Sequence, residues 1–185
     1  FLTICECADR SLLGGYLLLN LAGRPLEFHC TAPVRPSRAQ EILYGPTLKP
    51  FLYGEQIGAT LVNKAVSEPL FVCTDVEPAL ALREHAKVPV LLILSDETRD
   101  LIEHTSTDRS SPLRIDAPHP VVPQPSRLML LRFTLGGNHV AVANACESDR
   151  DGVLRRWPAQ GQQLDLAEPV TRIREAIEEA QRGPG

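Results

Sequence analysis

Two neighbouring apolar runs, residues 70–73 and 88–94, end in the same order of residue types: a hydroxyl residue, an aspartate and a nearby glutamate. The residues concerned are Thr74, Asp75 and Glu77 after the first run, and Ser95, Asp96 and Glu97 after the second. If the runs form neighbouring parallel strands, these carboxylates project from the same carboxyl edge of a sheet. Open α/β folds bind their ligands at that edge.

Clustered carboxylates at such an edge are suited to Mg²⁺ or Mn²⁺, because these hard cations prefer oxygen ligands. A metal held there can activate water for the hydrolysis of a phosphoester or an amide. This interpretation makes Asp75, Glu77 and Asp96 catalytic, and Asp75, Asp96 and Glu97 metal ligands. The same residue types are also common helix N-caps, so a purely structural role for them remains open.

Other chemical motifs are missing from the sequence. It contains no G-x-S-x-G nucleophile elbow, no phosphate-binding G-x-x-x-x-G-K-[ST] or G-x-G-x-x-G loop, and no H-E-x-x-H zinc motif. These absences favour a non-catalytic module for binding or assembly, without a cofactor, whose partner is another protein or a second copy of the chain. A divalent-metal hydrolase is the alternative.

Composition narrows the class of protein further. The chain has 185 residues, of which 43% are hydrophobic, and a formal net charge of −4. The missing basic excess argues against a nucleic-acid partner, and no apolar window is long enough for a membrane-spanning helix. The five cysteines are odd in number and scattered, which is typical of reduced thiols in a cytoplasmic protein rather than of a disulfide framework.

Two β-hairpins are predicted from short β-prone runs around turn residues. The first joins residues 16–20 to 26–31, and the second joins 128–135 to 139–144 through Gly136-Gly137-Asn138. Residues 26–31 alternate between apolar and polar types, which predicts a half-buried strand with its apolar side facing the core. The apolar positions are Leu26, Phe28 and Cys30, and the polar positions are Glu27, His29 and Thr31.

Helices are predicted at residues 37–44, where Ser37 and Gln40 fit a capping box, and at 47–66. A short helix between the two apolar runs would complete a central β-α-β unit. Residues 166–181 carry an apolar stripe at helical spacing and form a C-terminal amphipathic helix. Within the long helix, the spacing of Gly54 and Gly58 predicts a close approach by another element.

These elements predict one α/β (or α+β) domain over residues 1–185. Its mixed β-sheet contains two hairpins and the β-α-β unit, with helices packed on the sheet. Residues 103–126 are polar and then proline-rich, which predicts an irregular loop that is mobile until it binds a partner.

Overall fold

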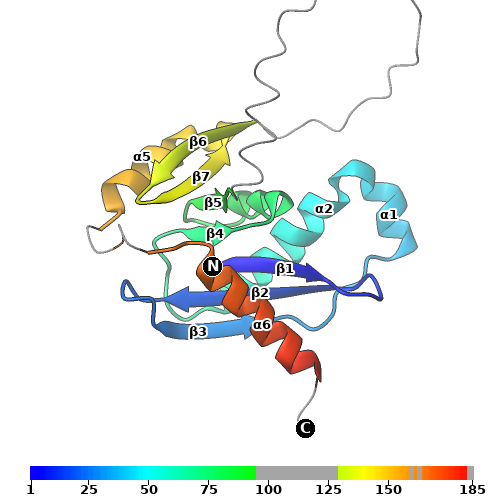
Figure 1. The fold of residues 1–185 in the computed structure, drawn as a ribbon. Helices are drawn as coiled ribbons and strands as arrows, with labels where there is room; N and C mark the ends of the chain where they lie inside the picture. The colour runs from blue at the N-terminus through cyan, green and yellow to red at the C-terminus, as the bar shows by residue number, and fades with distance from the viewer. Residues whose placement is uncertain (95–128, 159–160, 162–163, 183–185) are drawn as a thin grey trace, which may run out of the picture.

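The computed structural model describes residues 1–94, 129–158, 161 and 164–182. Its centre is one open seven-stranded mixed sheet with the strand order β3-β2-β1-β4-β5-β7-β6, which confirms the predicted α/β class (Figure 1). The predicted loop at 103–126 lies outside the described residues. The strands are β1 (Leu2–Glu6), β2 (Leu12–Leu19), β3 (Pro25–Cys30), β4 (Val72–Thr74), β5 (Val90–Ile93), β6 (Leu130–Leu135) and β7 (Asn138–Ala143).

The central β-α-β unit is confirmed, because β4 and β5 are parallel neighbours with Val72 opposite Val90. The crossover between them is the 3₁₀ helix η3 (Glu77–Glu84). Strand β1 pairs parallel with β4 and antiparallel with β2. Sequence analysis missed β1, although it is the strand that joins the first hairpin to the β-α-β unit.

Both predicted hairpins are present. Strands β6 and β7 pair around a turn in which Gly136 has a φ of 62°, a conformation that glycine adopts without steric cost. In the first hairpin, β2 begins at Leu12 and is longer than the predicted strand. Gly14 and Gly15 therefore lie inside β2 rather than ahead of it.

One face of the sheet is covered by a nearly continuous helical segment, residues 38–64, together with η3. This segment comprises α1 (Arg38–Tyr44), η1 (Gly45–Thr47), α2 (Leu48–Pro50), the π-helix η2 (Phe51–Ala59) and α3 (Thr60–Lys64). The capping box of Ser37 and Gln40 is confirmed at the start of α1. The predicted close approach is also confirmed: a Cβ on Gly54 would lie 2.6 Å from the backbone nitrogen of Leu82 in η3.

The opposite face carries α6 (Glu168–Arg182) over β1 and β2, and α5 (Glu147–Arg156) over β6 and β7 (Figure 1). The amphipathic helix is confirmed, since Ile173 and Ile177 are buried against Leu13 and Leu17. Sequence analysis missed α5, because it is polar along most of its length and buries few side chains. In the described part of the chain, every helix is too short or too polar to span a bilayer.

Strand β2 is sandwiched closely between helices at its two adjacent glycines. A Cβ on Gly14 would lie 2.2 Å from Cγ2 of Ile57, and a Cβ on Gly15 would lie 2.3 Å from Cγ2 of Ile173. Each distance is far shorter than a van der Waals contact. The glycine pair thus lets η2 and α6 approach the sheet from its two sides, which fixes α6 beside the outer strand β3.

Candidate functional site

Asp75 follows β4 at the carboxyl edge of the sheet, as predicted, but its carboxylate is engaged within the fold. Its Oδ1 accepts a 2.7 Å hydrogen bond from Oγ1 of Thr3 in β1, and its Oδ2 pairs with the guanidinium of Arg174 in α6. Asp75 does not cap η3: Val76 holds the N-cap position of that helix, and no side chain in the described structure accepts a capping bond there. The Asp75 side chain thus ties α6 to β1 and β4.

The remaining predicted site residues do not complete a metal centre in the described structure. Glu77 lies exposed in the first turn of η3, and Asp96 and Glu97 lie outside the described residues. Among the residues that are described, no group of three or more His, Cys, Asp and Glu side chains converges as metal ligands would. The metal hydrolase therefore stays a prediction, with one of its proposed ligands already bonded to Arg174.

A different feature stands out on β3, which is an edge strand of the sheet. The predicted alternation along β3 is present, but its orientation is the reverse of the prediction. Leu26 is 56% exposed, Phe28 is 43% exposed and Cys30 is also exposed, whereas Glu27 and His29 are partly buried. The prediction that the apolar side of this strand faces the core is wrong.

The polar side of β3 faces inward because its groups have hydrogen-bond partners there. The Glu27 carboxylate accepts 2.9 and 2.8 Å bonds from the backbone N–H groups of Val66 and Ser67, and a 3.1 Å contact from Nε2 of His29. These bonds, led by the one from Val66, lower the pKa of Glu27 from 4.5 to about 2. The His29 ring also stacks against Tyr16, with 6.4 Å between centroids.

The backbone of β3 also presents unpaired hydrogen-bonding groups. The N–H of Thr31 donates to the carbonyl of Gly14, so the backbone groups of Thr31 point toward β2. In an antiparallel ladder this direction alternates with every residue. The N–H and C=O groups of Phe28 and Cys30 therefore point away from β2. The alternation ends at Leu26, which is the extra residue at the register shift opposite Leu18 and Leu19. Among the described residues, nothing hydrogen-bonds to the outward groups of Phe28 and Cys30 from the outer side.

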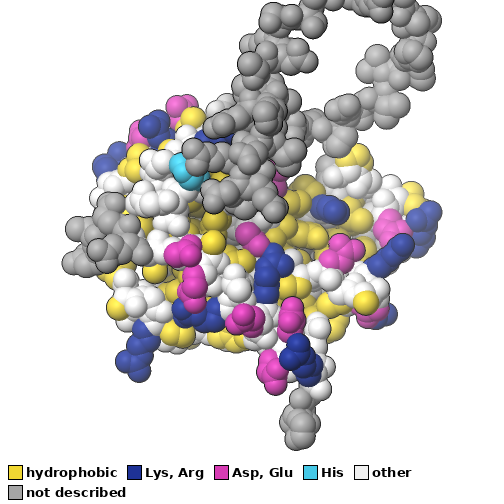
Figure 2. Space-filling view, viewed as in Figure 1, with side chains coloured by type: hydrophobic (Ala, Val, Ile, Leu, Met, Phe, Trp, Pro, Cys, Tyr) yellow, Lys and Arg dark blue, Asp and Glu magenta, His cyan; other side chains and the backbone are white. Residues whose placement is uncertain are grey.

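The apolar row on β3 (Leu26, Phe28 and Cys30) continues into a cavity of about 570 Å³ between β3, the β1–β2 turn and the C-terminal part of α6. Cys30 belongs to both features. Figure 2 shows the same side of the molecule: charged side chains gather along α6, and hydrophobic surface lies beside them along the lower margin, over β3. The cavity is lined by Cys7, Leu13, Cys30, Pro33, Ile177 and Ala180, among others.

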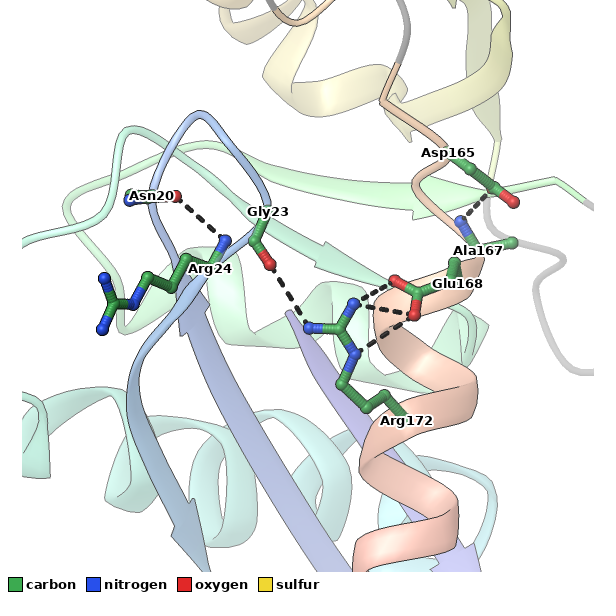
Figure 3. Close-up of polar contacts among 7 residues, drawn as sticks. All are labelled: Asn20, Gly23, Arg24, Asp165, Ala167, Glu168 and Arg172. Carbon is green, nitrogen blue, oxygen red and sulfur yellow. Dashed lines mark hydrogen bonds and ion pairs between the residues drawn. The ribbon is translucent and has the colours of Figure 1, made fainter.

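The turn that precedes β3 is fixed to the start of α6 (Figure 3). Arg172 binds the Glu168 carboxylate through bonds of 2.6 to 3.1 Å and donates a 3.3 Å bond to the carbonyl of Gly23. Within the turn, Oδ1 of Asn20 accepts a 2.9 Å bond from the N–H of Arg24. Strand β3 is therefore held in a fixed position before any partner arrives, which reduces the entropy that binding would cost.

No protein-family model matches the chain, and neither a curated protein nor a solved structure is significantly similar to it. The candidate site therefore depends on geometry alone. Sequence analysis found the alternation on β3 but assigned the wrong side to the core. The residue that could have indicated the true inward side is Glu27. Its carboxylate, once partly buried, needs hydrogen-bond donors, and only a neighbouring element can supply them.

Proposed function

We propose that this protein is a binding or assembly module that docks a polypeptide along the open edge of β3. The observation that carries the proposal is the coincidence of exposed apolar side chains and outward backbone groups on Phe28 and Cys30, with the exposed Leu26 beside them. An extended segment added to an open sheet edge gains main-chain hydrogen bonds, and alternate side chains give it specificity.

Ordinary edge strands are protected against such pairing by lysines, prolines or bulges that disrupt the edge. Strand β3 has a proline only at its first residue, Pro25, and a register shift opposite Leu18 and Leu19 at the same end. Beyond the bulge residue Leu26, the outward positions Phe28 and Cys30 are apolar and carry no charge. An unprotected apolar edge of this kind is typical of a surface that a partner covers.

The other properties of the chain agree with a protein partner. The net charge of −4 offers no electrostatic attraction to the phosphates of a nucleic acid. All five cysteines are free thiols, which supports our proposal that the protein works in the reducing cytoplasm. The apolar cavity beside Cys30 gives the partner a place for one side chain beyond the strand itself.

Selection of short random peptides displayed on phage against the immobilised full chain tests this function. We expect peptides with alternating apolar residues, and we expect their binding to be lost in Phe28→Lys and kept in Leu43→Lys. Leu43 is a matched control because it is 82% exposed on the distant helix α1, so its substitution introduces the same charge elsewhere. A selection that yields no peptide dependent on Phe28 would contradict the proposal.

A further inference from the structure

We infer that the partner of the β3 edge is a short extended segment of about five residues, with one aromatic side chain that enters the cavity beside Cys30. This inference rests on the proposed function of β3 as a docking edge, and it specifies the length and the anchoring residue of the docked segment. The length follows from where the regular edge ends, and the aromatic anchor follows from the walls of the cavity.

The regular edge of β3 begins later than the strand itself. Leu18 lies opposite Glu27 and Leu19 lies opposite Pro25, which leaves Leu26 as an extra residue in the ladder. An extra residue of this kind locally disrupts pairing and bends the strand. Pro25, just before it, has no N–H group to donate. Regular pairing on the outer side of β3 therefore begins at Glu27.

A second irregularity closes the other end of this edge. The N–H of Thr31 donates to the carbonyl of Gly14, whereas Leu12 is bridged to Val34. Three steps along the chain after β3 therefore correspond to only two steps along β2, so one extra residue is present here as well. Pro33 lies within this irregular stretch and also lacks an N–H group. Regular pairing therefore ends at Thr31.

The stretch between the two irregularities limits what can dock. Within residues 27–31, Phe28 and Cys30 direct their N–H and C=O groups away from β2. Paired strands advance by the same rise per residue, so a segment that covers this stretch has about five residues. Folded proteins that associate stably bury about 1,200–2,000 Å² of surface, and so short an edge is far from providing it. A short segment is therefore the occupant that fits, rather than the edge of another folded sheet.

The outward side chains of β3 lie on the same face of the sheet as the cavity. Phe28 is opposite Leu17 and Cys30 is opposite Gly15, and directly opposed residues have their side chains on one face. Leu17 packs against α6, and a Cβ on Gly15 would lie against Ile173 in that helix. A partner residue opposite Cys30 therefore has its side chain on the α6 face as well, at the margin of the cavity that Cys30 lines.

The walls of the cavity favour an aromatic side chain. Its volume of about 570 Å³ lies within the range of about 300–1,000 Å³ that is usual for ligand sites, so a large ring can enter it. The thiols of Cys7 and Cys30 line the cavity, and sulfur atoms make favourable contacts with aromatic rings. The rest of the wall is largely apolar and includes Leu13, Pro33, Ile177 and Ala180.

The polar groups of the wall already have partners within the chain. The Asp9 carboxylate accepts bonds of 3.0 and 2.6 Å from the N–H and Oγ of Ser11, and it pairs with the guanidinium of Arg35. Nε2 of Gln181 donates a 3.2 Å bond to Sγ of Cys7. Because Arg35 already neutralises Asp9, a cationic side chain gains little here. The cavity therefore favours an uncharged, apolar anchor.

Peptides recovered from a random dodecapeptide library, displayed on phage and selected with the full wild-type chain, test the length and the anchor. We expect the recovered sequences to share one aromatic position within an alternating apolar pattern. Synthetic versions truncated to about five residues around that position should keep their affinity within tenfold, as measured by fluorescence anisotropy. Replacing the aromatic residue by alanine should weaken binding at least tenfold, because it empties the cavity.

A variant of the cavity wall tests the anchor from the side of the protein. Ala180 lines the cavity and is exposed on α6, so Ala180→Trp fills the cavity without changing β3. Ala176→Trp is the matched control, because Ala176 is exposed on the same helix and does not line the cavity. We expect Ala180→Trp to weaken binding of the selected peptides at least tenfold and Ala176→Trp to leave it unchanged. Unchanged thermal midpoints will verify that both variants fold.

Three results would overturn the inference: selected peptides that share no aromatic position, binding that is lost on truncation to this length, or equal binding to Ala180→Trp and Ala176→Trp. If the binding in those cases still depended on Phe28, the docking function would stand without this length and anchor. A selection that yields no peptide dependent on Phe28 would refute the two proposals together.

Discussion

Replacing Gly15 by alanine tests whether the close packing of α6 on β2 determines the stability of the fold. The added Cβ would lie 2.3 Å from Cγ2 of Ile173 and 2.9 Å from Cδ1 of Ile177. The first distance is about 1.1 Å below the 3.4 Å at which ordinary van der Waals contact begins. To remove that overlap, α6 must move away from the sheet or Ile173 must leave its preferred rotamer.

Overpacking of this kind costs about 1–3 kcal/mol, and alanine recovers about 0.5–1 kcal/mol of the backbone entropy that glycine loses in a strand. We therefore expect Gly15→Ala to lower the free energy of unfolding by about 1–2 kcal/mol. Ile173→Ala should cost about 2–5 kcal/mol, because the Ile173 side chain is fully buried. Urea denaturation followed by circular dichroism measures both changes.

The decisive measurement is the double variant. In the Ile173→Ala background the obstructing Cγ2 is gone and only the 2.9 Å approach to the side-chain end of Ile177 remains, so Gly15→Ala should cost clearly less free energy there than in the wild type. Gly152→Ala is the matched control, because nothing lies within 4 Å of its added Cβ and alanine favours the helix α5 by about 1 kcal/mol. If Gly15→Ala costs the same free energy with and without the Ile173 side chain, the packing argument is refuted.

Three further predictions concern the groups around the site. The pKa of Glu27 is lowered to about 2, so its carboxylate stabilises the fold above pH 4.5 and this contribution is lost as the pH falls toward 2. The difference between the urea midpoints at pH 7 and pH 3 should therefore be smaller in Glu27→Gln than in the wild type. Asp75→Asn should lower the free energy of unfolding in urea by about 1–3 kcal/mol, both with and without Mg²⁺, because Arg174 loses its charged partner. If Mg²⁺ or Mn²⁺ stabilises the wild-type chain through Asp75, the hydrolase is favoured instead. An alkylating agent should modify the exposed Cys30 first and Cys73 only after unfolding, as followed by mass spectrometry, because burial raises the pKa of the Cys73 thiol to about 12. Rapid labelling of Cys73 in the folded chain would contradict this burial.

The sequence alone determined the elements whose signals are local. The β6–β7 hairpin follows from its Gly-Gly-Asn turn, α1 from its capping box and α6 from an apolar stripe at helical spacing. The parallel pair β4 and β5 follows from two apolar runs joined by one short connection. In each case a few neighbouring residues contain the physical cause, so the pattern could be recognised without knowledge of the rest of the chain.

The tertiary structure decided the features that depend on distant partners. Strand β1 is identified by its two neighbours in the sheet, and α5 by the strands on which it packs. Asp75 became an anchor for α6 because Arg174, almost a hundred residues later, lies beside it.

The alternation on β3 was visible in the sequence, but the side that faces inward was not. That choice was made by the backbone N–H groups of Val66 and Ser67, which bind Glu27 from the end of a helix on the other side of the sheet. A two-residue period defines two faces and does not say which one is buried. The exposed row on which the proposed function rests is therefore a product of tertiary contacts.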